Sequence, residues 1–201
     1  MTTLRSRAKA SRRTALLSAA AHLFARSGFN GVSIEDLGSA VGVSGPAVYR
    51  HFSSKPAVLS ALLVGASENL QAGGERVIDA ATDAPAALAA LVAFHVDFAL
   101  SNPDVIRVQD RDLDSLPEAD RARVRSLQRS YVELWVRVLG DINPQVDTAL
   151  LRIRAHATFG LLNSTPHSAA LGRDRAGDPA VAEAQVRALL QQMALAALTP
   201  R

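Results

Sequence analysis

Two signals for the start of a helix lie only eleven residues apart in this chain, and they constrain its fold more than any other feature. Ser33 is followed three residues later by Asp36, which is the spacing of a capping box. Ser44 is followed by Pro46, and proline is tolerated in a first helical turn because the amide groups there lack helical partners. Gly42 lies between the two signals and allows the chain to reverse tightly. The pattern predicts two short helices joined by a tight turn.

Proline and glycine punctuate the rest of the chain, and no segment keeps the alternating apolar pattern of a strand. A first helix is expected from a cap at Ser11 to about Arg26, with Gly28 as a left-handed stop. A longer helix after residue 54 is expected to weaken or bend at Gly73-Gly74. Further helices are expected at approximately 85–101, 103–115, 117–141, 144–164 and 179–198, with a mobile loop at 165–178.

These signals together predict an all-α fold with two domains. Residues 1–53 would form an N-terminal three-helix domain that contains a helix-turn-helix, and residues 54–201 a C-terminal helical bundle. Hydrophobic residues make up 48% of the sequence, which is enough for a sizeable buried core. The sequence contains no cysteine, so disulfides and cysteine-ligated metals are excluded, and a reducing cytoplasm is expected.

The charge is distributed unevenly along the chain. Residues 1–60 hold eight basic and two acidic residues, whereas the remainder holds 14 basic and 17 acidic residues. A basic segment on a mildly acidic body indicates that one end meets a polyanion, although a solvated basic tail would give the same count. No secretory signal is recognisable, and the longest apolar stretch, Ala86–Phe94, is too short to span a membrane. No membrane partner is expected.

In a helix-turn-helix the second helix enters the major groove of DNA and leads with its N-terminal residues. The residues placed to face base edges are therefore Ser44, Gly45, Pro46, Ala47 and Arg50. Arg50 is the only one with a long donor fork, so it is the candidate for a bidentate guanine contact. Phosphate contacts are expected from Tyr49, His51 and Lys55, and from the hydroxyl or amide of Ser33.

The run from Val43 to Lys55, preceded by Ser33–Leu37, resembles the DNA-binding domain of the TetR family. The resemblance covers roughly residues 11–60, and its Tyr-x-His-Phe-x-x-Lys ending is more distinctive than a generic helix-turn-helix. It implies a homodimeric repressor that binds a DNA operator and releases it when the C-terminal domain binds a small effector. One departure is Gly38, where the family usually has alanine. Glycine there is expected to cost the helix on the order of 1 kcal/mol and to reduce the rigidity of the domain.

The C-terminal half offers aromatic and polar residues at helical spacing, which is typical of an effector pocket inside a bundle. Three helices carry them, and the candidates are Phe94, His95, Phe98, Tyr131, Trp135, His156, Phe159 and Asn163. The alternative is an ordinary core in which the histidines are buried and satisfied. The histidines lack the spacing of a metal site, and neither a metal nor a cofactor is expected.

The last two long helices are candidates for a dimer interface, because their faces are rich in small and aliphatic residues. The residues concerned are Leu150, Arg154, Ala157 and Leu161 on one helix, and Val186, Leu189, Leu190, Met193 and Ala197 on the other. The same faces could instead close the bundle of a single chain.

The effector is expected to be a small hydrophobic molecule or an acyl-CoA. The chain is similar to alanine- and arginine-rich bacterial regulators, several of which govern lipid or acyl-CoA breakdown. Arg107 and Arg111 would suit a phosphate or carboxylate on such a ligand, but they would equally pair with nearby aspartates. Two other functions remain open. An enzyme is not expected, because no catalytic or phosphate-binding motif is present. The other alternative is a protein-interaction module that does not read DNA, but it would not explain why Tyr49, His51 and Lys55 occur together.

Overall fold

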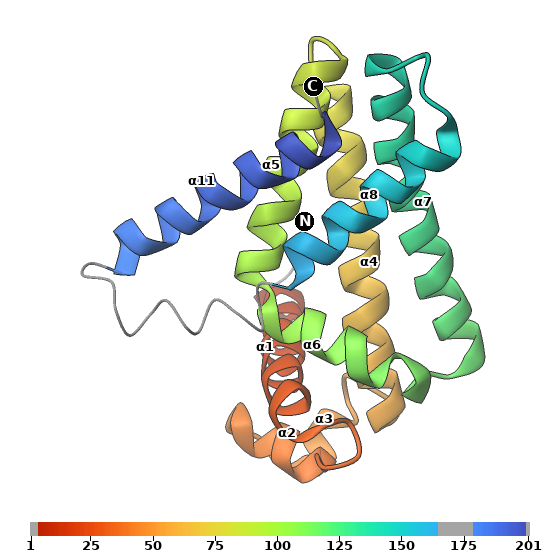
Figure 1. Ribbon diagram of the computed structural model, residues 1–201. Helices are drawn as coiled ribbons and strands as arrows, with labels where there is room; N and C mark the ends of the chain where they lie inside the picture. Colours follow the sequence, from red (N-terminus) through yellow and green to blue (C-terminus); the bar gives the residue numbers. More distant parts are fainter. Residues whose placement is uncertain (1–3, 165–178, 200–201) are drawn as a thin grey trace. The chain divides into compact units, whose positions relative to one another are not determined.

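A computed structural model describes residues 4–164 and 179–199 of the chain. Every element in these residues is a helix, which confirms the all-α prediction (Figure 1). The predicted loop at 165–178 lies outside the described residues. In chain order the elements are α1 (Leu4–Ser27), α2 (Ile34–Ala40), α3 (Gly45–Val48), α4 (Lys55–Asp79), α5 (Ala84–Ser101), α6 (Pro103–Asp112), the 3-10 turn η1 (Leu113–Ser115), α7 (Glu118–Ile142), α8 (Thr148–Asn163) and α11 (Pro179–Leu198).

Two helix ends near the N-terminus differ from the predicted positions. α1 begins at Leu4 rather than at Ser11, because residues 4–10 contain no glycine or proline to stop it. The predicted basic tail is therefore largely helical. α3 ends at Val48 instead of near Phe52, because the backbone tightens there: the amide of His51 donates to the carbonyl of Val48 at 2.9 Å, a three-residue step.

Two further predictions about boundaries were wrong. α4 runs without interruption through Gly73-Gly74, although the pair was expected to weaken it. A side chain at Gly73 would lie 2.1 Å from the Phe94 ring, and one at Gly74 would lie 2.7 Å from the Tyr131 ring. These glycines therefore allow α5 and α7 to approach α4 closely. α8 begins four residues later than predicted, because Asp147 accepts the amide of Ala149 and caps it there.

The chain forms two compact units. The first consists of the residues up to Ala66 together with Asp104–Val124, and the second of Ser67–Pro103 together with the residues from Arg125 onward. α4 and α7 each contribute to both units, so the compact units do not coincide with the predicted division at residues 53 and 54. The core of the first unit includes Phe24, Leu37 and Phe52. The functional division stays a prediction.

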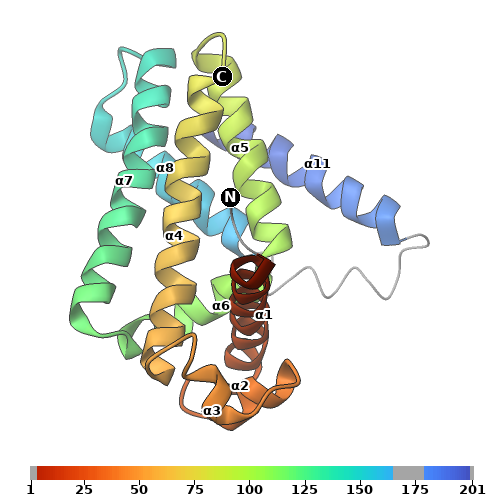
Figure 2. The same ribbon diagram turned by 180° about the vertical axis from the view of Figure 1, so that it is seen from behind.

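In the second unit α11 packs against α5 and α8, as both ribbon views show (Figures 1 and 2). α5 is the one described helix that is long and apolar enough to cross a membrane, which corrects the shorter stretch taken from the sequence. Its Leu91, Val92 and His95 are buried in the core of this unit. A buried core helix passes the same test of length and composition, so α5 is weak support for a membrane span.

Candidate functional site

The start of α2 is fixed by the capping box that the sequence predicts. The Ser33 hydroxyl accepts the amide of Asp36 at 3.0 Å, and the Asp36 carboxylate accepts the amide of Ser33 at 2.8 Å. The Ser33 hydroxyl also donates to that carboxylate, and these bonds lower the pKa of Asp36. Both donors of Ser33 that were expected to reach phosphate are thus committed to Asp36.

The turn between α2 and α3 depends on two glycines. Gly42 has a φ of 69°, a left-handed conformation that suits the tight turn expected there, and Gly28, the predicted left-handed stop, has a φ of 76°. The amide of Val43 then donates to the carbonyl of Gly38 at 2.9 Å. A Cβ at Gly38 would lie 2.7 Å from the Val43 carbonyl oxygen, so α2 and the turn can only approach this closely because residue 38 has no side chain. Gly38 therefore permits the packing of the motif, a role the sequence analysis missed.

The segment formed by α3 and the turn that follows it has one buried and one exposed side. Val48 and Phe52 are buried in the core of the first unit, whereas Tyr49 is 54% exposed. Arg50 is also exposed, and its guanidinium has no hydrogen-bond or ion-pair partner among the described residues. Of the other predicted base readers, Ser44 and Pro46 are exposed and Ala47 is half-buried. Gly45 is buried, with Glu35 at the position a side chain would take.

Lys55 is engaged within the protein rather than extended into solvent. Its ammonium donates to the carbonyls of Phe29 and Val32 at 2.9 Å each and lies 4.5 Å from the centre of the Phe29 ring. Two of its three donors thus hold the segment that precedes α2. His51 is half-buried, and its Nδ1 atom has no hydrogen-bond partner in the structure.

Arginines from α1 and α6 brace this motif, a role for which the sequence gives no periodic signal. Arg12 donates to the carbonyl of Val41 at 3.2 Å, and Arg13 lies 4.9 Å from the centre of the Phe52 ring. Arg111 pairs with Asp112 at 3.1 Å and also donates to the carbonyl of Phe24. Its neighbour Arg107 pairs with Asp104 at 3.4 Å. The sequence suggests pairing of these arginines with Asp110, Asp112 or Asp114; it is observed for Arg111 at Asp112, whereas Asp104, the partner of Arg107 here, was not among them.

In the second unit, six of the eight candidate effector residues come together in one cluster. His95 lies at its centre: its Nδ1 is 3.3 Å from the Tyr131 hydroxyl and its Nε2 is 3.2 Å from Oδ1 of Asn163. Ring contacts join the remaining members, and the cluster consists of His95, Phe98, Tyr131, Trp135, Phe159 and Asn163. This aromatic cluster combines residues of α5, α7 and α8.

Burial governs the titration of the aromatic cluster. It lowers the pKa of His95 to about 4, against the smaller opposing effect of the hydrogen bond to Asn163. Burial also raises the pKa of Tyr131, so both side chains are neutral near pH 7. The two remaining candidates lie outside the cluster's hydrogen bonds and ring contacts. Phe94 packs beside Gly73, and His156 is exposed on α8.

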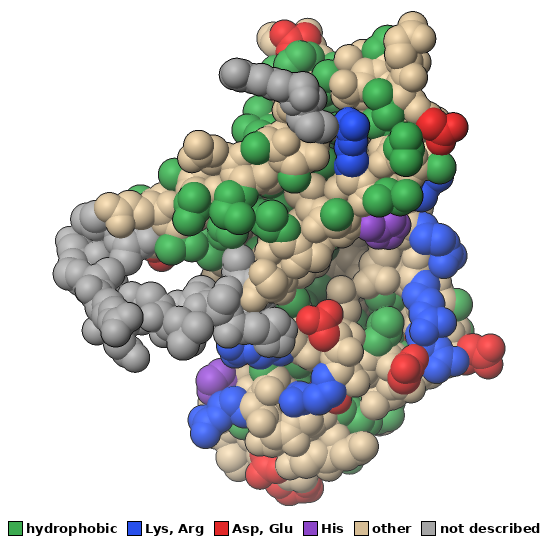
Figure 3. Space-filling model, viewed as in Figure 1, with side chains coloured by type: hydrophobic (Ala, Val, Ile, Leu, Met, Phe, Trp, Pro, Cys, Tyr) green, Lys and Arg blue, Asp and Glu red, His purple; other side chains and the backbone are tan. Residues whose placement is uncertain are grey.

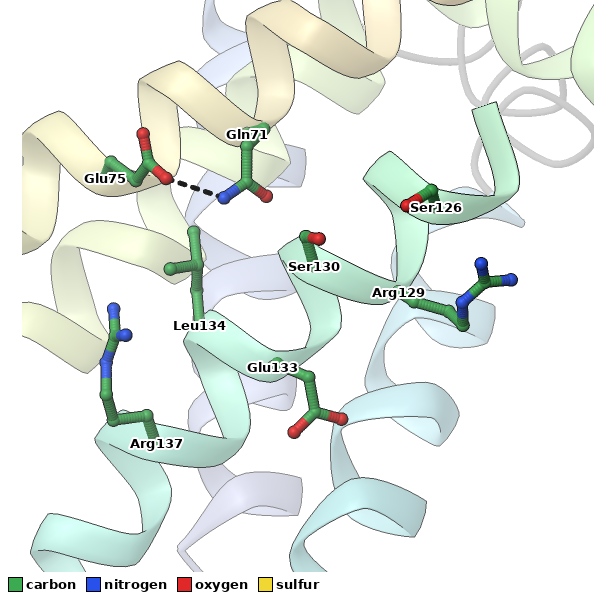
Figure 4. A pocket seen from close by; sticks show the side chains of 8 residues that line it. All are labelled: Gln71, Glu75, Ser126, Arg129, Ser130, Glu133, Leu134 and Arg137. Atoms are coloured by element: carbon green, nitrogen blue, oxygen red, sulfur yellow. Dashed lines mark hydrogen bonds between the residues drawn. The ribbon is translucent and has the colours of Figure 1, made fainter. Parts of the chain in front are cut away.

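A separate polar groove of about 390 Å³ lies between α4 and α7, and the sequence analysis missed it (Figure 4). Its lining consists of Gln71, Glu75, Ser126, Arg129, Ser130, Glu133, Leu134 and Arg137. The Gln71 amide donates to Glu75 at 2.7 Å, and Glu133 is held by Arg152 at 2.7 Å. The groove is polar and its carboxylates are already bonded within the protein, so its chemistry differs from that of the aromatic cluster. The groove and the aromatic cluster have no residue in common.

The faces of α8 and α11 expose aliphatic side chains. Leu150 and Ile153 on α8 are 53% and 63% exposed, and Leu189 and Met193 on α11 are 55% and 43% exposed. Figure 3 shows apolar side chains gathered over α11. Ile153 was not among the residues selected from the sequence. Val186, Leu190 and Leu161 are only half-buried, whereas Ala157 and Ala197 are exposed.

Comparisons with known proteins agree with this architecture. Residues 16–62 match the family model for bacterial regulatory proteins of the tetR family, and residues 81–167 match that for a tetracyclin repressor-like C-terminal domain. The chain is 29% identical to the HTH-type transcriptional repressor KstR2 of Rhodococcus jostii, over 71% of this chain and 73% of that protein.

Two solved structures have the same fold. A TetR-family transcriptional regulator from Bordetella parapertussis superposes with a TM-score of 0.77 at 24% identity, covering 91% of this chain and 93% of the other. The structure of AibR in complex with isovaleryl coenzyme A and operator DNA gives a TM-score of 0.72 at 15% identity, covering 90% and 97%. The two family matches agree with the observed helix-turn-helix and helical bundle. The chain therefore belongs to the TetR family of bacterial regulatory proteins.

Proposed function

We propose that this protein is a cytoplasmic transcriptional repressor that binds a palindromic operator as a homodimer. A small, mainly hydrophobic effector binds in the second unit and releases the DNA. The observation that carries the DNA-binding part is the pair Tyr49 and Arg50, which α3 leaves exposed while its neighbours Val48 and Phe52 anchor it in the core.

The two residues have different roles in the proposed complex. Arg50 carries a planar fork of donors and has no partner among the described residues, so it is free to bind a guanine edge. Tyr49 offers a hydroxyl to a phosphate, whereas the exposed Ser44 and Pro46 at the start of α3 face base edges. Ala47 faces the groove from the same turn. Gly45 contributes only by its lack of a side chain.

Lys55, Ser33 and His51 act mainly through the geometry of the motif in this proposal. Lys55 keeps one donor for phosphate while the other two hold the carbonyls of Phe29 and Val32. Ser33 fixes the start of α2, and a phosphate there would compete with Asp36. His51 can offer its other ring nitrogen, Nε2, to a phosphate. Its Nδ1 atom is buried and has no hydrogen-bond partner among the described residues.

The effector site is proposed at the aromatic cluster, with Phe94 as a flanking apolar wall and His156 at the periphery. Support comes from the cluster's apolar character and from a solved structure of the same fold, that of AibR, which is in complex with isovaleryl coenzyme A and operator DNA. An effector releases DNA only if it binds better to the arrangement in which the two recognition helices are wrongly spaced. Operator binding requires them about 34–36 Å apart.

Footprinting on the DNA upstream of the protein's own gene and its neighbours tests operator binding. Protection of an inverted repeat, weakened by added salt, is expected because phosphate contacts release counterions. If no repeat is protected at moderate salt, the protein is not an operator-binding repressor, and the protein-interaction alternative takes its place.

Variants of α3 test the division of roles. Arg50→Ala is expected to relax the preference at one base position, with a loss of about 1–3 kcal/mol on the preferred operator. Tyr49→Ala is expected to weaken binding to all sequences equally. Arg26→Ala, which removes one exposed charge outside the motif, is the matched control. A uniform loss for Arg50→Ala across operator variants would refute its role in base readout.

Lys55→Met separates positioning from phosphate binding. The change leaves two backbone carbonyls without their donor, so we expect a lower free energy of unfolding by about 1–3 kcal/mol as well as weaker DNA binding. Urea unfolding and gel-shift titration of the same preparation measure the two effects. Unchanged stability with reduced affinity would mean that Lys55 acts through phosphate alone.

A further inference from the structure

The aromatic cluster has one buried donor that its own residues leave unused. Oδ1 of Asn163 can only accept, so the Nε2 atom of His95 that faces it at 3.2 Å carries the ring hydrogen and donates. The Nδ1 atom of neutral His95 is then an acceptor, and it takes the Tyr131 hydroxyl hydrogen at 3.3 Å. The two ring nitrogens of His95, the Tyr131 hydroxyl and Oδ1 of Asn163 are thus paired with one another.

Trp135 is the exception in this network. Its side chain is fully buried, yet its indole N–H has no hydrogen-bond partner in the structure. The indole N–H is near enough to the Tyr131 hydroxyl to oppose part of the rise in the pKa of Tyr131, but it forms no hydrogen bond among the described residues. A buried donor without an acceptor destabilises the folded protein, because it has lost its hydrogen bonds to water. An acceptor from outside the chain would recover that free energy.

The surroundings of Trp135 restrict the nature of such an acceptor. Its ring neighbours are Phe159 at 4.9 Å, His95 at 6.0 Å and Tyr131 at 6.2 Å between ring centres. None of these is charged near pH 7, because burial holds His95 in its neutral form. A carboxylate here would be desolvated without a cation to balance it. Phe159 and Asn163 are only half-buried, so the cluster is approachable from α8.

We propose that the aromatic cluster binds an uncharged, largely apolar ligand through a carbonyl-type oxygen that accepts the Trp135 indole N–H. The Phe159 ring, partly exposed and in contact with the indole, is the side chain that moves to admit it. The ligand needs no donor of its own, since Tyr131, His95 and Asn163 are already paired. This inference rests on the proposed effector site and specifies the chemistry that the site selects.

The full-length protein offers a direct test, because Trp135 is its only tryptophan and gives a single indole N–H resonance. Three probes of similar shape are titrated: acetophenone, its hydrocarbon isostere α-methylstyrene, and benzoate. Acetophenone is expected to move the indole resonance downfield and to bind roughly fivefold to tenfold more tightly than α-methylstyrene, the gain of one buried hydrogen bond. Benzoate is expected to leave the resonance in place.

Variants assign the preference to the indole. In Trp135→Phe, calorimetry is expected to give equal affinities for acetophenone and α-methylstyrene, whereas Tyr131→Phe retains the preference. Phe159→Ala enlarges the site and is expected to bind acetophenone more tightly. Equal affinity for the two probes in the wild-type protein overturns the proposal. A ketone preference that survives in Trp135→Phe, or a resonance that no probe shifts, also overturns it.

A gel-shift with the same preparation separates this inference from the proposed function. If the protein binds the operator but acetophenone neither shifts the indole resonance nor binds more tightly than α-methylstyrene, the ligand chemistry is refuted and the proposed repressor function stands. If acetophenone gives both effects but the protein does not bind the operator, the proposed repressor function is refuted and the ligand site stands.

Discussion

His95 illustrates at the scale of one residue how burial determines protonation. Its pKa is lowered to about 4 in the folded protein, against an ordinary value of 6.5 in the unfolded chain. Between these two values the unfolded chain binds more protons, so the free energy of unfolding increases with pH. The contribution of neutral His95 is complete above pH 6.5 and is lost as the pH falls toward 4.

Urea unfolding at pH 7 and pH 5 measures this contribution. We expect the wild-type protein to lose about 2 kcal/mol between these values through His95 alone. The variant His95→Gln keeps a side chain that can donate and accept, and it is expected to lose that part of the pH dependence. His156→Gln, at an exposed position on α8, serves as the control. An equal decrease in wild type and His95→Gln would show that His95 is not held neutral by the fold.

Lowered carboxylate pKa values do not interfere with this measurement. Hydrogen bonds from Ser33 lower the pKa of Asp36, and a hydrogen bond from Arg152 lowers that of Glu133. A carboxylate whose folded pKa is lowered contributes stability above its unfolded value and loses it only as the pH falls below that value. Both unfolded values, 3.8 and 4.5, lie below pH 5. These two carboxylates therefore contribute little to the change between pH 5 and pH 7, and the difference between wild type and His95→Gln gives the part due to His95.

At the scale of an element, two glycines in helices distinguish close packing from helix propensity. Alanine is favoured over glycine in a helix by about 1 kcal/mol. At Gly65 in α4 nothing lies within 4 Å of an added Cβ, so only propensity acts. At Gly38 in α2 the added Cβ would meet backbone atoms, with the Val43 oxygen at 2.7 Å, and backbone cannot move aside as the end of a side chain can.

We therefore expect opposite signs for the same substitution. Gly65→Ala should raise the free energy of unfolding by up to about 1 kcal/mol. Gly38→Ala should lower it by about 1–3 kcal/mol, because overpacking outweighs the gain in propensity, and it should weaken operator binding by displacing α3. Thermal and urea unfolding of both variants measure the difference. A stabilised Gly38→Ala protein would mean that α2 and the turn can separate at little cost.

These elements also show how far the sequence predicts the fold. The capping box at Ser33 and the left-handed turn at Gly42 are local, so residue type and spacing suffice to place them. Gly38 and the pair Gly73-Gly74 were misread, because their roles depend on backbone or rings that arrive from distant parts of the chain. Propensity alone cannot distinguish a glycine that weakens a helix from one that permits an approach.

The same distinction applies to the candidate sites. Helical spacing placed the candidate residues on three faces, and tertiary packing gathered His95 and five of the others into one cluster. The spacing could not reveal that Lys55 would be bonded to the carbonyls of Phe29 and Val32, because those partners lie 26 and 23 residues away. Nor could it reveal the unused donor of Trp135, which is a property of the finished core.

At the scale of the whole molecule, the exposed faces of α8 and α11 need a partner. Leu150 and Ile153 on one helix, and Leu189 and Met193 on the other, expose large aliphatic side chains, and groups of exposed apolar side chains are typical of an interaction site. The partner proposed is a second copy, since two helices from each chain form a self-complementary contact. A palindromic operator then presents one half-site to each recognition helix.

A buried charge in that contact should separate the dimer without unfolding the chain. Ile153→Glu and Leu189→Glu each replace an exposed residue, so neither disturbs the core of the second unit. We expect both variants to sediment as monomers and to bind the operator more weakly by on the order of 10²-fold, because the two half-sites are no longer linked. Ala122→Glu introduces the same charge at an exposed position on α7 and should stay dimeric with full affinity. Analytical ultracentrifugation beside gel-shift titration gives both quantities. If Ile153→Glu and Leu189→Glu both stay dimeric, the dimer contact lies elsewhere. If the wild-type protein is a monomer and still protects both half-sites, operator binding does not require a dimer contact.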